Sequence, residues 1–149
     1  GDERLKTMSR LSAYHRIAGN LEEALHLAEE VDVSATGQLK LTNRIRMTVI
    51  YQFLGEYNRA LEIMADCEKT ILANPAFRPT LDFINQHRGK MFFEMNELEK
   101  ALHEFNEALK LREAKNDRLL IQSSAFAIEK TRERLNQAKA SNEMDERPS

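Results

Sequence analysis

The sequence has little of what builds turn-rich, disulfide-bonded or membrane-spanning proteins. Its 149 residues include one cysteine, three prolines, five glycines and no tryptophan. The single cysteine, Cys67, excludes an internal disulfide and is expected to be a small core residue, and the scarcity of proline and glycine disfavours a β-fold with many turns. No hydrophobic run approaches the roughly 18 residues of a membrane span, and no signal-peptide pattern opens the chain. We therefore expect a helical protein in the cytoplasm.

The chain also lacks an excess of one charge. Its 22 Lys and Arg residues nearly balance its 24 Asp and Glu residues, which gives a formal net charge of −2. Three acids and one base within residues 141–149 account for the whole imbalance, so residues 1–140 are formally neutral. This balance argues against a broad electrostatic footprint for nucleic acid or an anionic membrane, and we expect neither as a partner.

What the sequence does contain is a repeated amphipathic pattern. Between residues 98 and 111 the apolar side chains recur at three- and four-residue steps, which places them on one face of a helix. The same order occurs twice upstream: a turn residue, a polar residue, a large apolar residue and an Ala-Leu pair. The alanines of these pairs are Ala24, Ala60 and Ala101, which are 36 and 41 residues apart. Such spacings are typical of helical hairpins stacked in an array.

Turn and capping residues divide the pattern into about seven helices. The predicted elements are hairpins at about 3–31, 38–73 and 80–114 and a capping helix at about 117–138. Asp117 is the expected N-cap of the last helix. Together the helices make one domain over residues 1–140, and the polar tail at 141–149 is expected to be disordered. The residues expected to seal the capping helix onto the last hairpin are Leu119, Leu120, Ala127, Ile128 and Leu135.

The residues at fixed positions in each hairpin resemble those of the tetratricopeptide repeat (TPR) family. The third unit matches best, with Gly89, Phe92, Asn96, Leu98, Ala101, Phe105 and Ala108. The second unit matches with Thr48, Tyr51, Gly55, Tyr57, Ala60, Met64 and Cys67. The first is the poorest, with Ser12, His15, Gly19, Leu21, Ala24, Ala28 and Val31. The resemblance covers about residues 5–115 and implies an all-α, right-handed α-solenoid of three hairpins with a C-terminal capping helix.

In this family the first helix of each hairpin lines a concave groove, which implies a set of groove residues here. Those expected to contact a partner are Arg10, Arg16, Arg46, Gln52, Phe53, His87, Lys90 and Phe93. The groove set is basic and aromatic in a nearly neutral chain, so we expect a protein or peptide with acidic groups or a free carboxylate. Arg10 and Arg46 would hold the anion as bidentate donors, while Phe53 and Phe93 would provide apolar anchors.

Patterns for catalysis, cofactors and metals are missing from the sequence. There is no glycine-rich phosphate loop, no cysteine pair and no convincing Ser-His-Asp order. We therefore expect neither an enzyme nor a bound cofactor. His26 and His103 have glutamates at helical spacing, and we interpret them as surface residues, because a metal site needs three or four converging ligands. The charged run 129–134 mixes acids with bases and has no interleaved aromatic, which argues against nucleic-acid binding.

Three functions stay open at this point. The leading one is a non-catalytic adaptor or scaffold that binds a protein or peptide in the concave groove. The second is a regulatory, peptide-sensing fragment of a larger bacterial signalling or transcription protein, because the longer repeat period resembles that branch of the family. The start at Gly1 rather than Met is interpreted as a trimmed sequence. The third is a self-associating module, a homodimer formed through Phe126, Ile128 and Leu135 of the last helix.

Overall fold

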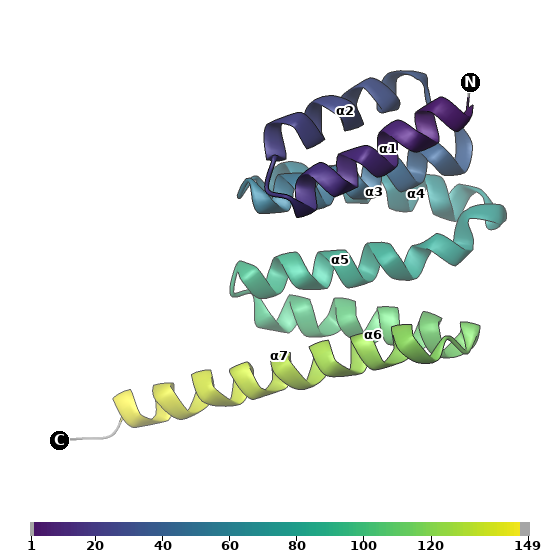
Figure 1. Ribbon diagram of the computed structural model, residues 1–149. Coiled ribbons are helices and arrows are strands. Elements are labelled where there is room, and N and C mark those ends of the chain that lie inside the picture. The colour runs from purple at the N-terminus through teal and green to yellow at the C-terminus, as the bar shows by residue number, and fades with distance from the viewer. Residues whose placement is uncertain (1, 147–149) are drawn as a thin grey trace. The chain divides into compact units, whose positions relative to one another are not determined.

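The computed structural model describes residues 2–146, in which every regular element is a helix (Figure 1). The elements are α1 (Asp2–Ile17), α2 (Leu21–Ser34), α3 (Gly37–Phe53), α4 (Tyr57–Ala73), the 3₁₀ helix η1 (Pro75–Thr80), α5 (Leu81–Glu94), α6 (Leu98–Lys115) and α7 (Arg118–Asp145). No strand occurs between residues 2 and 146. The predicted fold class, an all-α array of three helix hairpins and a capping helix, is confirmed.

The helices form two compact units, Gly1–Arg78 and Pro79–Ser149. In the first unit α1 pairs with α2 and α3 pairs with α4, and α1 and α2 also pack on α3. In the second unit α6 packs against both α5 and α7. The single domain expected over residues 1–140 stays a prediction. The boundary falls within η1, which contains two prolines and buries no side chain.

A residue in the left-handed conformation ends the first helix of each hairpin. The φ angle is +87° at Gly19, +78° at Gly55 and +61° at Asn96. At each turn the next amide donates to the carbonyl five residues earlier, as Glu97 N does to Phe92 O at 2.8 Å. Asparagine tolerates this conformation better than most residues, so it can replace the turn glycine of the third unit. The shared turn geometry shows that the three hairpins are structural repeats.

The interior of the first unit is built from small and aliphatic side chains around one buried ring, that of Tyr51. Its buried apolar residues include Ala24, Ala28, Val31, Ile50, Tyr51, Ala60, Met64, Cys67 and Ile71. Small residues allow α1 and α2 to approach closely, and the Ser12 hydroxyl donates to Ala24 O at 2.6 Å across their contact. The predicted core position of Cys67 is confirmed.

The second unit packs around one ring. Phe105, Ala101 and Ile128 form its buried cluster. A Cβ atom built at Gly89 would lie 2.5 Å from the Phe105 ring, so α5 and α6 approach closely only because this residue is glycine. The burial of Ile128 removes it from the surface through which a homodimer was predicted. Any dimer contact of α7 would have to use its exposed residues.

At the start of α7 the structure confirms the predicted N-cap but not the predicted burial of Leu119. The Asp117 side chain accepts a hydrogen bond from Leu120 N at 3.2 Å, which confirms the predicted N-cap. Leu119, however, is 76% exposed and does not seal the helix onto the hairpin. It lies one residue, about 100° of helix rotation, away from the inward-facing stripe that contains Leu120.

The end of α7 lies beyond its predicted position. The helix continues to Asp145 rather than ending near residue 138, and residues 141–146, expected to be disordered, form its last turns and C-cap. The stretch contains neither glycine nor proline, so nothing local ends the hydrogen-bond ladder. Residues 147–149 of the predicted tail lie outside the described residues.

Candidate functional site

The first unit carries three arginines close together on α1 and α3, here called the α1/α3 basic cluster: Arg10, Arg16 and Arg46. Arg46 is held in place by uncharged neighbours. Its Nη1 donates to Ser9 Oγ at 2.8 Å, and the Ser9 hydroxyl donates to Asn43 Oδ1 at 3.0 Å. Asn43 Nδ2 in turn donates to the Ala28 carbonyl at 2.8 Å. The buried chain of hydrogen bonds fixes the guanidinium before any partner arrives.

The charges of this cluster repel one another. Burial lowers the pKa of Arg46, and the positive charges of Arg10 and Arg16 lower this pKa further. Within residues 2–146, none of the three arginines forms an ion pair with a carboxylate. Arg16 lies over the ring of the exposed Phe53, with its guanidinium carbon 5.7 Å from the ring centroid. An anion placed here would be attracted by three cations and flanked by an exposed ring.

The second unit has a cleft of about 410 Å³ between α5 and α7. We call it the α5/α7 cleft, and its lining residues are Gln86, Lys90, Phe93, Glu94, Phe105, Ser123, Phe126, Ala127, Lys130 and Arg134. Gln86 and Phe105 are buried and form its floor, whereas Phe126 is 62% exposed at its rim. Three of the lining residues are bases and one is an acid, so the cleft has a positive balance.

Two of the cleft's cations lie over its two aromatic rings. The guanidinium carbon of Arg134 is 4.2 Å from the centroid of Phe93, and Lys130 Nζ is 5.5 Å from the centroid of Phe126. Arg134 makes no ion pair with a carboxylate among residues 2–146, and Lys130 makes only a long, exposed one of 3.9 Å with Glu133. Exposed pairs of this kind contribute little, so both cations stay available to an anionic ligand.

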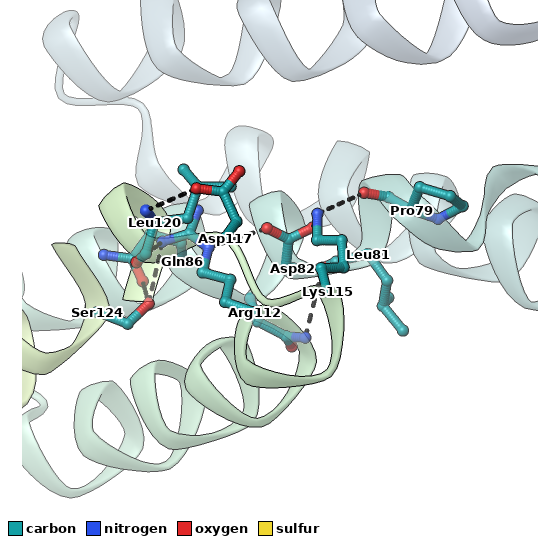
Figure 2. Close-up of polar contacts among 10 residues, drawn as sticks. Pro79, Leu81, Asp82, Gln86, Arg112, Lys115, Asp117, Leu120 and Ser124 are labelled. Carbon is teal, nitrogen blue, oxygen red and sulfur yellow. Dashed lines mark hydrogen bonds and ion pairs between the residues drawn. The ribbon is translucent and has the colours of Figure 1, made fainter. Parts of the chain in front are cut away.

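A buried hydrogen-bond network that includes charged side chains orients Gln86 at the floor of the cleft (Figure 2). Asp82 accepts from Arg112 Nε at 2.9 Å and from Lys115 Nζ at 2.6 Å. Arg112 Nη1 also donates to Ser124 Oγ at 2.9 Å, and the Ser124 hydroxyl donates to Gln86 Oε1 at 2.7 Å. Gln86 is 3% exposed, and its Nε2 has no hydrogen-bond partner among the described residues. The network therefore ends in an unused donor at the floor of the cleft.

The structure distributes the predicted groove residues over both units. It brings together Arg10, Arg16, Arg46 and Phe53 in the first unit, where Gln52 lies half-buried in the last turn of α3. In the second unit Lys90 and Phe93 line the α5/α7 cleft, whereas His87 is not among its lining residues. A single groove along all three hairpins stays a prediction.

Several cleft residues were missed by reasoning from the sequence. Phe126, Lys130 and Arg134 recur every four residues, which places them on one stripe of α7. That spacing is a usable signal, but from sequence alone the charged run 129–134 is considered only as a nucleic-acid site, which is excluded. The orientation of Gln86 gave no signal, because its partner Ser124 lies on α7 and the Arg112 that bonds Ser124 lies on α6.

The described residues also bear on other kinds of site. Between residues 2 and 146, no group of three His, Cys, Asp or Glu side chains is placed to hold a metal ion. His26 forms a surface pair with Glu30, with Nε2 and Oε1 3.0 Å apart, in agreement with its interpretation as a surface residue. In the same part of the chain, no helix combines the length and apolar character needed to cross a membrane.

The repeated hairpins define an α-helical repeat protein, and comparison with known proteins gives the repeat type. Residues 4–31 match the model of the tetratricopeptide repeat family. The matched segment is the first hairpin, which had been judged the poorest of the three from its sequence. The match places a TPR motif in residues 4–31, and the second and third hairpins repeat the fold of this segment. No curated protein matches the sequence.

Solved structures share the fold at low sequence identity. PcrH from Pseudomonas aeruginosa is 17% identical, with a TM-score of 0.69 over 88% of this chain and 93% of PcrH. PcrH in complex with the chaperone binding region of PopD gives the same identity and TM-score over 90% of this chain and 95% of that one. A putative kinesin light chain with nearly identical TPR-like repeats from Podosopora anserina is 13% identical, with a TM-score of 0.75 over 96% of this chain and 72% of that chain.

Proposed function

We propose that this chain is a non-catalytic TPR module that binds a protein or peptide and acts as an adaptor or scaffold. The fold supports a binding role, since the similar PcrH has been solved in complex with the chaperone binding region of PopD. The cytoplasmic location expected from the sequence belongs to the same proposal. The alternatives of a peptide-sensing fragment and a self-associating module stay predictions, and sedimentation would test the second.

The observation that carries the proposal is the α1/α3 basic cluster. Arg46 is fixed by the buried Ser9–Asn43 hydrogen bonds and lies near two further arginines, with no carboxylate paired to any of them in residues 2–146. Mutual repulsion among the three cations is relieved when an anion binds, so an acidic side chain or a free carboxylate gains from all of them. Phe53 adds an exposed apolar contact beside the charges.

Affinity capture from a lysate of the source cells tests this proposal. The parent chain is compared with the double variant Arg46→Ala, Phe53→Ala, and binding of each captured protein is then repeated with the purified partner. We expect the parent to retain a partner and the variant to bind it at least tenfold more weakly, since anchors of this kind contribute about 1 to 2 kcal/mol each.

A matched control is available in the same unit. The double variant Leu72→Ala, Arg78→Ala likewise removes one exposed apolar side chain and one arginine, but from α4 and η1. It should bind like the parent, and circular dichroism should show equal helicity for all three chains. Equal affinity of the parent and the Arg46→Ala, Phe53→Ala variant would contradict the proposed role of the cluster.

A further inference from the structure

We propose that the α5/α7 cleft is a second peptide subsite, which takes an extended segment with a large apolar side chain next to an acidic one. The inference deepens the proposed function and rests on it, because it assigns the ligand chemistry of a site that the first hairpins do not contain. Three separate features of the cleft define this ligand: its unused donor, its rings and its cations.

The unused donor calls for a hydrogen-bond acceptor. Arg112 can only donate, so its bond to Ser124 Oγ makes that oxygen an acceptor and directs the hydroxyl hydrogen elsewhere. The hydroxyl donates to Gln86 Oε1, and this fixes the amide with its Nε2 as the spare donor. Leaving a buried donor unpaired costs about 1 to 3 kcal/mol. A backbone carbonyl of a bound peptide would satisfy it.

The rings call for an apolar side chain. Phe93 and Phe126 line the cleft from α5 and α7, and the buried Phe105 closes its floor. The volume of about 410 Å³ lies within the range of sites that hold small ligands, and a large apolar side chain with its flanking backbone fits this size. The ring of Phe126 would be covered on binding, which explains a large aromatic side chain left 62% exposed.

The cations call for an acidic neighbour and argue against a second copy of this chain. Lys90, Lys130 and Arg134 face one acid, Glu94, among the lining residues. Arg134 is stacked on Phe93 and has no carboxylate partner among residues 2–146, so it can bind a carboxylate next to the ring. In a symmetric dimer through this cleft, the basic rim of one copy would meet the basic rim of the other. Like charges in contact disfavour that arrangement.

A display library of random heptapeptides, capped at both ends of the random segment, tests the inference on the full chain. We expect the peptides retained by the parent to be enriched in Asp or Glu next to Phe, Leu, Ile or Met. The most enriched peptide is then synthesised with a fluorescent label, and its dissociation constant is measured by anisotropy. Raising the salt concentration should weaken its binding.

Single variants identify the contribution of each feature. Arg134→Gln and Phe126→Ser, both at exposed positions, should each weaken binding of the labelled peptide about tenfold. Gln86→Met keeps the side-chain length but removes the spare donor and should weaken binding severalfold. Glu94→Gln should instead tighten binding, because it removes the one acid of the lining. A purely structural role of these residues would not give opposite signs for Glu94 and Arg134.

Control variants separate failure of this inference from failure of the proposed function. The double variant Leu119→Ser, Arg132→Gln changes the same kinds of residue on α7 outside the cleft and should bind like the parent. If the retained peptides depend only on Arg46 and Phe53, the α5/α7 cleft is not a peptide subsite, and the proposed function still stands. Retention of no peptide would overturn the cleft subsite, whereas the proposed function is overturned only by the capture experiment. Self-association lost on Phe126→Ser would overturn the peptide subsite in favour of a second copy.

Discussion

The two units hold their arginines in opposite ways. In the first unit Arg46 is oriented by the uncharged side chains of Ser9 and Asn43, and the nearby charges are those of two further arginines. In the second unit Arg112 is buried and paired with Asp82, which Lys115 also contacts. A buried charge without a partner is very costly, whereas a partly exposed one is tolerated. Arg112 therefore stabilises the fold through its buried ion pair, whereas Arg46 keeps a partly exposed charge with no carboxylate partner among residues 2–146.

The polar networks of the two units also end differently. The first ends at the backbone carbonyl of Ala28, which accepts from Asn43, so each described member of that chain is paired. The second ends at Gln86, whose Nε2 is unused. Complete networks serve stability, and a network with one spare donor next to an open cleft is better explained by a ligand. The predictions below test each side of this comparison.

The largest effect is expected from Asp82→Ala in the second unit. The substitution leaves Arg112 buried without its counter-charge and removes the shorter contact to Lys115. Loss of one partner of a buried ion pair typically lowers the free energy of unfolding by about 3 to 5 kcal/mol. Urea unfolding followed by circular dichroism would measure the change.

The double variant Asp82→Leu, Arg112→Met is the control for this prediction. It removes both buried charges together and should recover most of the lost stability, because no charge is left unpaired in the interior. If the single variant unfolds at the same urea concentration as the parent, the ion pair is not what holds α5 to α6.

A smaller loss is expected from Asn43→Ala in the first unit. This variant removes the acceptor of the Ser9 hydroxyl and the side-chain donor to the Ala28 carbonyl, while Ser9 Oγ keeps its bond from Arg46 and no charge becomes unpaired. We expect the free energy of unfolding to fall by about 1 to 3 kcal/mol. Reaction of Cys67, the one thiol of the chain, with a thiol reagent reports opening of this unit and should become faster. Equal loss from Asn43→Ala and Asp82→Ala would remove the contrast between the units.

The repeat fold could be predicted from the sequence because its determinants are local. Apolar spacing and the turn residues Gly19, Gly55 and Asn96 are visible along the chain, and all three turns adopt the same left-handed geometry. The sequence predicts the end of α7 too early, because a polar and acidic composition is typical of disorder. Without glycine or proline to end it, the helix continues to Asp145.

The candidate sites were less predictable because they depend on pairing between helices. The sequence led to Arg46 and Phe53 through the family resemblance, but the Ser9–Asn43 contact that orients Arg46 joins α1 to α3. The spare donor of Gln86 depends on Arg112 and Ser124, two residues whose contact exists only in the folded chain. Hydrogen-bond direction is a property of the whole network and cannot be assigned to one residue in advance.

The smallest effect concerns the dependence of the first unit on pH. Burial raises the pKa of the Cys67 thiol to about 11, whereas an unfolded cysteine ionises near pH 8.5. Between about pH 8.5 and pH 11 the folded chain therefore keeps the Cys67 thiol proton while the unfolded chain loses it. The contribution of the protonated thiol to stability is complete at neutral pH. It falls from about pH 8.5 until the folded thiol ionises near pH 11. Between pH 7 and pH 9 the parent should lose about 1 kcal/mol more than Cys67→Ala, as measured by urea unfolding. Parallel pH profiles of the two chains would show that the thiol is not shielded, and the packing of α4 in the first unit would then need revision.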